Sequence, residues 1–395
     1  MRVFKSIKYW GKFFIDTTIL YLSMLFPRKR NLMIFGAWFG NKYDDNPKYL
    51  FEYIYNFRKD LKVTWITSND MVYQIVKSKN LPVCKSHSWK AIYLSLRARY
   101  VITATYNLGG DIGEKLMKLM GGARFINLWH GVPLKKVVFD DDLSRPRETI
   151  GTKLQYFLQS FPHRHCYHFA TSPEIKRRYI SCFRSDDKHV IDVGQARNDY
   201  FYVEHKNPYR ERFSSKKIIV YMPTHRREGK QIMDMYKLLD LKRINELCEK
   251  YNAVFLIKKH FYHRNEPTIG SEFSCIYEIT HETTPSQIIL DCADILITDY
   301  SSCYIDHLLL DRPQIFYCFD LNDYLAHDRG MYEEYKPNIP GPICSDKETL
   351  CSEIEDALNG VDKFEDKRRA KRDYYYSKWN QREVSPQQTE QILKL

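Results

Sequence analysis

The chain has 395 residues, of which 44% are hydrophobic and 28% charged, values that indicate a globular protein and are not those of a disordered or fibrous chain. Its length suits two domains of about 100–200 residues, and its net charge of +12 predicts an anionic partner: nucleic acid, a membrane surface or a phosphate-rich substrate. The ten cysteines are scattered, with no CxxC pair and no histidines at zinc spacing, so we expect free thiols.

The first 30 residues combine basic and apolar side chains in the manner of a membrane-surface helix. The basic residues are Arg2, Lys5, Lys8, Lys12, Arg28, Lys29 and Arg30. The apolar stretch from Phe13 to Phe26 contains Asp16 and is shorter than the ~20 residues that a membrane span requires. No small-residue cleavage site for a signal peptide follows it. We therefore expect peripheral attachment to an anionic membrane at its cytoplasmic face, with a helix docked on the protein's own surface as the alternative.

A first series of alternating strands and helices follows. Apolar runs at 32–35, 63–66, 100–104 and 125–128 predict buried strands, and residues 47–58 have the spacing of a helix. Alternation of this kind predicts a parallel sheet that is covered by helices on both faces.

A second series of strands is predicted at 218–221, 253–257, 295–297 and 314–317, after a polar segment that contains Pro208. The chain is therefore predicted to be an α/β protein of GT-B type, with two facing Rossmann-like domains. The predicted parts are a membrane-surface segment 1–30, an acceptor domain 31–205, a donor domain 206–360, and terminal helices 361–395 packed outside the second sheet.

The turn after the strand at 295–297 carries Asp299, Ser301 and Ser302. Backbone N–H groups and hydroxyls at such a turn can bind a phosphate or diphosphate. An ordinary serine N-cap is the alternative for the same pattern.

His130 follows the strand at 125–128 and lies in a turn made by Gly131 and Pro133. The carboxyl ends of parallel strands are where α/β proteins build their sites. Nearby Lys135 and Lys136 suit a polyphosphate and would keep an imidazole neutral enough to accept a proton. A single histidine is otherwise most often structural.

Three further cationic positions follow predicted strands. Lys258 and His260 end the strand at 253–257 and could neutralise a transferring phosphate, unless they form only a solvated basic loop. Arg197 and Arg226 each follow an apolar run, and the planar guanidinium suits bidentate phosphate binding. The acidic run 140–142 is interpreted as a solvated loop, so no metal and no obligatory cofactor is predicted.

Several motifs, taken in order, resemble the CDP-glycerol glycerophosphotransferase family of teichoic-acid primases and polymerases. They are Gly40–Leu50, Asn127–Lys136, Gly194–Asp199, Tyr221–Arg226, Asp299–Ser302 and Arg329–Tyr332 followed by Pro340–Pro342. The chain departs from the family pattern at Ala196, where proline is usual, and at His225, where an aromatic residue is usual.

The resemblance implies transfer of an alditol phosphate, most simply glycerol phosphate, from CDP-glycerol or CDP-ribitol to a hydroxyl of a lipid-linked or polymeric acceptor, with release of CMP. It implies that His130 is the base, that His260 stabilises the phosphate, and that Arg329 borders the same site. It leaves open the alditol, primase or polymerase activity, and teichoic acid or capsule polymer. The alternatives are a GT-B glycosyltransferase that uses a nucleotide sugar and, more remotely, a nucleic-acid-binding protein, for which the chain has no recognised motif.

Overall fold

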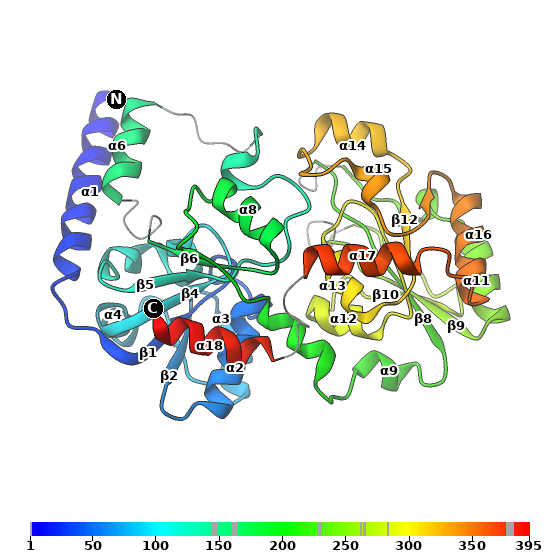
Figure 1. The fold of residues 1–395 in the computed structure, drawn as a ribbon, viewed down its shortest axis with the longest axis horizontal. Coiled ribbons are helices and arrows are strands. Elements are labelled where there is room, and N and C mark those ends of the chain that lie inside the picture. The colour runs from blue at the N-terminus through cyan, green and yellow to red at the C-terminus, as the bar shows by residue number, and fades with distance from the viewer. Residues whose placement is uncertain are drawn as a thin grey trace. The chain divides into compact units, whose positions relative to one another are not determined.

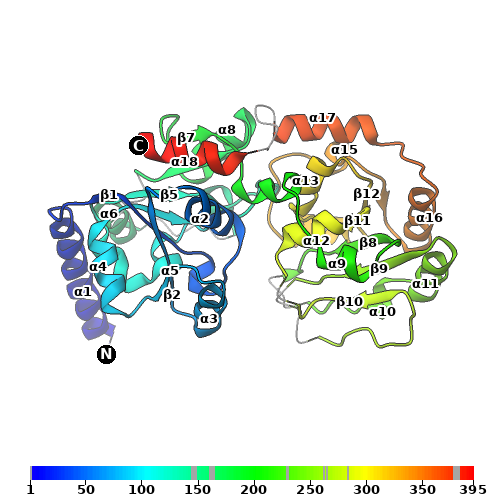
Figure 2. The ribbon, with the colours of Figure 1, turned by 90° about the horizontal axis from the view of Figure 1, so that it is seen from below.

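The computed structural model describes residues 2–143, 149–159, 165–227, 231–260, 263, 266–282, 284–376 and 383–395. The chain forms two compact units (Figures 1 and 2). Unit 1 contains Met1–His130, Arg145–Asp199 and Lys378–Leu395, and unit 2 contains Gly131–Ser144 and Tyr200–Ser377.

Unit 1 is built on a seven-stranded parallel sheet with the order β3-β2-β1-β4-β5-β6-β7. Its strands are β1 (Lys29–Phe35), β2 (Lys62–Thr67), β3 (Val83–Lys85), β4 (Ala98–Thr103), β5 (Arg124–Asn127), β6 (Tyr167–Ala170) and β7 (Val190–Asp192). Its helices are α1 (Arg2–Ser23), α2 (Asp45–Phe57), α3 (Asp70–Ser78), α4 (Trp89–Arg97), α5 (Leu108–Ile112), α6 (Ile150–Gln159), α8 (Pro173–Cys182) and α18 (Val384–Lys394). A 3₁₀ helix, η2, spans Glu114–Leu119.

Helices cover both faces of this sheet, as the alternation of β1 shows. Met33 and Phe35 pack into one core with residues of α2, α3 and α18. Leu32 and Ile34 pack into a second core with residues of α4, α5 and η2. Burial on both faces explains why the strands are apolar runs without a polar side.

Unit 2 is built on a six-stranded parallel sheet with the order β10-β9-β8-β11-β12-β13. Its strands are β8 (Lys217–Met222), β9 (Ala253–Ile257), β10 (Ile276–Glu278), β11 (Ile295–Thr298), β12 (Gln314–Tyr317) and β13 (Ile343–Cys344). Its helices are α9 (Pro208–Arg212), α10 (Met235–Leu238), α11 (Leu241–Lys250), α12 (Ser286–Cys292), α13 (Cys303–His307), α14 (Leu321–His327), α15 (Tyr335–Asn338), α16 (Lys347–Leu358) and α17 (Glu365–Tyr375). One core joins β8, β9, β11 and β12 to α11 and α16.

Local sequence signals set where several helices begin. The side chain of Asn69 accepts hydrogen bonds from backbone N–H groups at the start of α3, and Asp346 does so at the start of α16. Ser172 caps α8, whose first residue is Pro173. These are the residue types that satisfy the unpaired N–H groups of a helix start.

The predicted α/β architecture and all eight predicted strands are present. Strands β3, β6, β7, β10 and β13 were not predicted, and each has only two to four residues. Runs this short carry too little periodicity to be distinguished from loops.

Two segments belong to a different unit from the one that we expected. The segment after His130 joins unit 2, where the backbone N–H of Lys136 donates to the Gly330 carbonyl (2.7 Å). Helix α18 belongs to unit 1, whereas we expected all of 361–395 outside the second sheet. The Asp199 carboxylate, in unit 1, accepts from the backbone N–H groups of Val384 (2.7 Å) and Ser385 (2.8 Å) and so holds the start of α18.

Helix α1 docks on unit 1 by one face. Phe13 and Leu20 are buried, and Asp16 forms an ion pair with Lys118 of η2 (2.5 Å). This is the docked-helix alternative of the sequence analysis, and it leaves the opposite face exposed. Within the described residues, none of the helices combines the length and the hydropathy needed to cross a bilayer.

Candidate active site

His130 lies just beyond the end of β5 in unit 1, where the backbone turns at Trp129 (φ 55°) and Gly131 (φ 149°). Its Nδ1 is 2.9 Å from the carbonyl oxygen of Ala104. A carbonyl can only accept a hydrogen bond, so Nδ1 carries the proton and Nε2 is the basic nitrogen of the neutral ring.

The surroundings of His130 favour the neutral imidazole. Burial lowers the pKa of His130 below its usual value, and the positive charges of Arg197 and Lys42 add to this. The Asp45 carboxylate and the hydrogen bond to Ala104 act in the opposite direction. A neutral ring with Nε2 unprotonated is the form that a general base needs.

Arg197 supports this turn from inside unit 1. Its Nη1 donates both to Asp45 Oδ1 (2.7 Å) and to the carbonyl oxygen of His130 (2.7 Å). Trp38 also contributes: its Nε1 donates to Asp45, and its ring centroid lies 4.8 Å from that of the imidazole. The predicted phosphate ligand Arg197 is thus 5% exposed and engaged by the protein itself.

The backbone around His130 is strained. Four non-glycine residues there have left-handed φ angles: Trp38 (49°), Phe39 (56°), Asp45 (58°) and Trp129 (55°). Such conformations are costly for L-residues and cluster at functional sites. Four such residues therefore lie around His130.

In unit 2, Asp299 and Arg226 organise the turn after β11. Arg226 donates from Nη2 to Asp299 Oδ2 (2.8 Å) and from Nε to Asp320 Oδ2 (2.6 Å). Asp299 also accepts from the backbone N–H of Thr224 (2.8 Å), which joins the end of β8 to the end of β11. Both partners of the Arg226–Asp299 pair are buried, so Arg226 is an internal support in this structure.

The two serines of the turn differ. Ser301 Oγ accepts from the backbone N–H of Cys303 (3.3 Å) and so acts partly as the cap that we considered as the alternative. Ser302 precedes α13 and makes no side-chain cap bond. Both hydroxyls are half-buried. The prediction that they bind a phosphate remains a prediction.

Lys135 lies beside this turn because the segment 131–144 belongs to unit 2. Its Nζ donates to the hydroxyl of Tyr324 (3.0 Å), and burial lowers its pKa to about 8, with Asp299 opposing that effect and Arg329 adding to it. The ring of Tyr324 stacks on Tyr300 with centroids 3.9 Å apart. The Lys135 ammonium therefore lies against Tyr324, whose ring stacks on Tyr300.

Arg329 reaches the same segment through Asp141, with 3.3 Å between Nε and Oδ2. Asp141 is only 1% exposed, which corrects the interpretation of 140–142 as a solvated loop. Among the residues that the structure describes, no three His, Cys, Asp or Glu side chains are grouped as a metal-binding set.

His260 follows β9 and lies beside His225, with 4.7 Å between the ring centroids. Burial lowers the pKa of His225 to about 4, and the charges of Lys135 and Arg329 contribute. Lys258 donates its ammonium protons to the carbonyl oxygens of Ile279 (3.1 Å) and Glu282. His260 thus lies near the cationic cluster through its neighbour, whereas Lys258 is bound to the backbone.

The predicted residues form two clusters. In unit 1, Arg197 contacts His130. In unit 2, Arg226 contacts Asp299, while Lys135, Arg329 and His260 surround them through neighbours.

The sequence analysis missed Trp38, Asp45 and Asp320 and gave no role to His225. Asp320 could have been found, because it follows β12 at the same edge of the sheet as Asp299.

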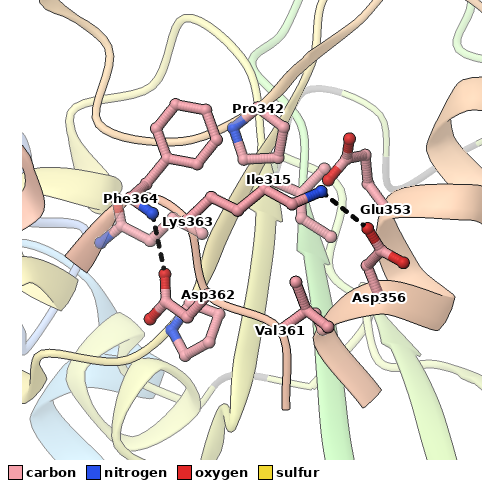
Figure 3. Close-up of a pocket in the computed structure, with 11 residues that line it drawn as sticks. Ile315, Pro342, Glu353, Asp356, Val361, Asp362, Lys363 and Phe364 are labelled. Carbon is pink, nitrogen blue, oxygen red and sulfur yellow. Dashed lines mark hydrogen bonds and ion pairs between the residues drawn. The ribbon is translucent and has the colours of Figure 1, made fainter. Parts of the chain in front are cut away.

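A small cavity in unit 2 lies apart from these clusters, among β12, α16 and the loop that leads to α17 (Figure 3). Its volume is about 20 Å³, and Lys363 forms an ion pair with Asp356 at its edge (3.2 Å). That space holds about one water molecule and is too small for a nucleotide.

Comparison with known proteins extends over nearly the whole chain. Residues 19–394 match the family described as CDP-Glycerol:Poly(glycerophosphate) glycerophosphotransferase. The chain is 28% identical over 381 residues to the teichoic acid glycerol-phosphate transferase of Staphylococcus aureus, covering 92% of this chain and 92% of that protein.

A longer relative and a solved structure agree with this match. The teichoic acid poly(glycerol phosphate) polymerase of Staphylococcus epidermidis is 26% identical over 89% of this chain, which spans about half (48%) of that protein's length. The structure of the wall teichoic acid polymerase TagF is similar in fold, with a TM-score of 0.73 at 21% identity, over 99% of this chain and 96% of that chain. The α/β fold with two Rossmann-like units is thereby confirmed.

Proposed function

Since the chain belongs to the CDP-glycerol:poly(glycerophosphate) glycerophosphotransferase family and is therefore a transferase, we propose that it transfers glycerol phosphate from CDP-glycerol to a hydroxyl of a lipid-linked or polymeric acceptor. The observation that carries the proposed mechanism is the half-buried imidazole of His130, whose tautomer leaves Nε2 as a base. CDP-ribitol is the alternative donor.

His130 acts on the acceptor. Its Nε2 takes the proton of the attacking hydroxyl, while the oxygen forms a bond to the phosphorus that carries the alditol. The bond from that phosphorus to the CMP oxygen breaks, and CMP leaves. Such a displacement needs a positioned nucleophile and charge neutralisation more than covalent help from the protein.

Unit 2 acts on the donor. Lys135, Arg329 and His260 supply positive charge around the turn of Ser301 and Ser302 and offset the negative charge of the diphosphate. The pKa of His225 is lowered mainly by burial, and the charges of Lys135 and Arg329 add to this, which supports their presence around the turn. Arg226 keeps the turn in shape through Asp299 and Asp320.

The enzyme reaches a lipid-linked acceptor by attaching peripherally to the cytoplasmic face of an anionic membrane. The outer face of α1 exposes Phe14, Ile15 and Leu22 beside Lys12. Helix α6 is adjacent, because Tyr21 donates from its hydroxyl to the carbonyl oxygen of Leu158 (3.2 Å). It adds the exposed Ile150, Leu154 and Phe157. Exposed apolar residues beside lysines are typical of interfacial helices.

Co-sedimentation with vesicles that contain anionic phospholipid tests the attachment. The double variant Phe14→Asp, Leu22→Asp should lose most vesicle binding, because both side chains are about half exposed on α1. The control Phe57→Asp changes a phenylalanine on α2 that is even more exposed (71%) and should bind as the wild type does. Equal binding by all three proteins would contradict the assignment of this face.

CMP release tests the reaction. The purified protein is incubated with CDP-glycerol and, in parallel, with CDP-ribitol, together with a detergent extract of acceptor lipids. Acceptor-dependent CMP that is abolished by His130→Ala and by His260→Ala is the expected result. Release of a nucleoside diphosphate from a nucleotide sugar, with no CMP from either donor, would contradict the proposal and indicate a glycosyltransferase instead.

A further inference from the structure

Asp45 stands at the centre of the contacts that hold His130. We propose that Asp45 is a positioning residue for the reaction: through Arg197 and Trp38 it fixes both the backbone and the ring of the histidine that takes the acceptor's proton. The role of His130 rests on the proposed function, whereas the contacts of Asp45 are those of the structure itself.

The backbone conformation of Asp45 serves the contacts of its side chain and does not stabilise the start of α2. It begins α2 with φ of 58°, although its preceding residue Asp44 already provides the capping carboxylate by accepting from the backbone N–H of Asp45 (2.9 Å). A left-handed aspartate at a helix start costs conformational energy. Asp45 as a whole residue is only 9% exposed, and its carboxylate faces the interior of unit 1.

The first arm of the support runs through Arg197. One guanidinium nitrogen, Nη1, is 2.7 Å from Asp45 Oδ1 and 2.7 Å from the His130 carbonyl oxygen. The carboxylate therefore holds the guanidinium where it can anchor the peptide of the base. Charge-assisted hydrogen bonds of this kind are among the strongest in proteins.

The second arm runs through Trp38. Its indole N–H donates to the other carboxylate oxygen, Oδ2, and its ring lies against the imidazole with 4.8 Å between centroids. Trp38 itself has φ of 49°, so the hydrogen bond to Asp45 holds a strained residue in place. The two oxygens of the Asp45 carboxylate thus bind Arg197 and Trp38, and each of these residues contacts His130.

Asn46, the next residue, strengthens the same junction. Its side-chain NH₂ donates to the carbonyl oxygens of Leu128 (3.2 Å) and Trp129 (2.9 Å), and its oxygen accepts from the backbone N–H of Arg197 (3.1 Å). The start of α2 therefore ties the turn before His130 to the loop that carries Arg197.

The charge of Asp45 also acts on the imidazole. The groups around His130 with an electrostatic effect are Asp45, which raises its pKa, and Arg197 and Lys42, which lower it. Removing the carboxylate leaves the two cations unopposed. The imidazole should then hold its proton less well, so that it remains a base at lower pH but a weaker one.

Asp45→Asn tests the proposal, because asparagine keeps the size of the side chain and loses its charge. We expect kcat for CMP release to fall by about 10–100-fold, in line with the loss of a base's orientation and strength. We expect KM for CDP-glycerol to be unchanged, since the donor is assigned to unit 2. The acid limb of the kcat–pH profile should move to lower pH by about 0.5–1 unit.

Asp70→Asn is the matched control. Asp70 also begins a helix of unit 1, α3, but its side chain is 96% exposed and pairs with Lys85. It should leave kcat and the pH profile unchanged. A fall in kcat for Asp45→Asn with an unmoved acid limb would reduce Asp45 to a structural residue and overturn the proposal.

A titration of the imidazole without substrate separates this inference from the proposed function. In ¹⁵N-histidine-labelled protein, with the His130 signal assigned by its loss in His130→Gln, the pKa of His130 should be lower in Asp45→Asn than in the wild type. This outcome would hold even if the wild type released no CMP. An unchanged His130 pKa would contradict the inference whatever the activity.

Discussion

The cluster around His130 in unit 1 and the cluster around Asp299 in unit 2 are each held by a buried arginine, but the charges around them differ. In unit 1 the buried Arg197 pairs with one carboxylate, Asp45, and also anchors the backbone of His130. In unit 2 the buried Arg226 pairs with two carboxylates, Asp299 and Asp320. In each unit, one buried guanidinium holds the turn at which we propose the site.

What differs is the charge that surrounds each support. Unit 1 keeps an imidazole neutral by burial, which suits a proton acceptor. Unit 2 gathers the charged side chains of Lys135 and Arg329 beside the rings of His225 and His260, an arrangement that suits a diphosphate. The comparison teaches that the buried Arg197 and Arg226 are held by carboxylates of their own unit. The more exposed Lys135 and Arg329 are the cations that we propose for the substrate.

The largest effect is expected from removing the base. His130→Gln should lower kcat for CMP release by about 10²–10⁴-fold, because general base catalysis is lost. Glutamine keeps a polar group in the turn but cannot accept the proton. CMP release under saturating donor and acceptor measures the change.

The matched control for that variant is His87→Gln, which changes an exposed histidine of the same unit. It should turn over like the wild type. If His130→Gln kept more than a tenth of the wild-type kcat, the base would have to be sought elsewhere.

Stability distinguishes the two arginines. Arg226→Met leaves two carboxylates without their cation, the fully buried Asp299 and the 13% exposed Asp320, and should lower the free energy of unfolding by about 3–5 kcal/mol. Arg197→Met leaves only one, and the Asp45 side chain is 13% exposed, so a smaller loss is expected. Urea unfolding measures both. A greater loss for Arg197→Met would reverse the ranking of the two supports.

In the proposed function, the charge of Lys135 makes the binding of CDP-glycerol depend on pH. Its pKa of about 8 means that its charge is present at pH 7 and is lost as the pH rises through 8. KM for CDP-glycerol should therefore rise by up to about tenfold between pH 7 and pH 9, since one charge–phosphate contact disappears.

Lys135→Arg should remove this rise, because arginine keeps its charge throughout that range. Lys242→Arg, an exposed lysine of α11, is the control and should retain the pH dependence of the wild type. The assignment of Lys135 to the donor fails if Lys135→Arg retains the same dependence.

The smallest effect is expected at Arg329, whose side chain is 44% exposed. Arg329→Gln should raise KM for CDP-glycerol by about two- to fivefold, because an exposed cation is screened by water and salt. Arg227→Gln removes a similarly exposed arginine, paired with Asp323 at 3.4 Å, and should have no effect. Equal changes in both variants would show that the effect is one of net charge only.

The sequence predicted most of the fold because the long strands are buried on both faces and appear as apolar runs. The rule that sites form at the carboxyl ends of parallel strands located His130, His260 and Asp299. It did not reveal that the 131–144 segment and α18 each join the other unit, because those contacts join groups far apart in the chain, Lys136 with Gly330 and Asp199 with the start of α18.

The sequence also did not reveal which carboxylates pair with Arg197 and Arg226. Asp45 and Arg197 are separated by 152 residues, and Arg226 and Asp320 by 94, so their pairing depends on tertiary structure. Without those partners, each arginine was interpreted as a phosphate ligand. The structure supports a role for both as internal supports.

The division of labour between the units is tested most directly by measuring donor binding apart from turnover. Calorimetric titration with CDP-glycerol is carried out on the wild type, His130→Gln and Lys135→Met. We expect His130→Gln to bind CDP-glycerol with the wild-type Kd although its kcat for CMP release is strongly lowered, and Lys135→Met to bind more weakly. Loss of CDP-glycerol binding in His130→Gln, with wild-type binding in Lys135→Met, would contradict the account.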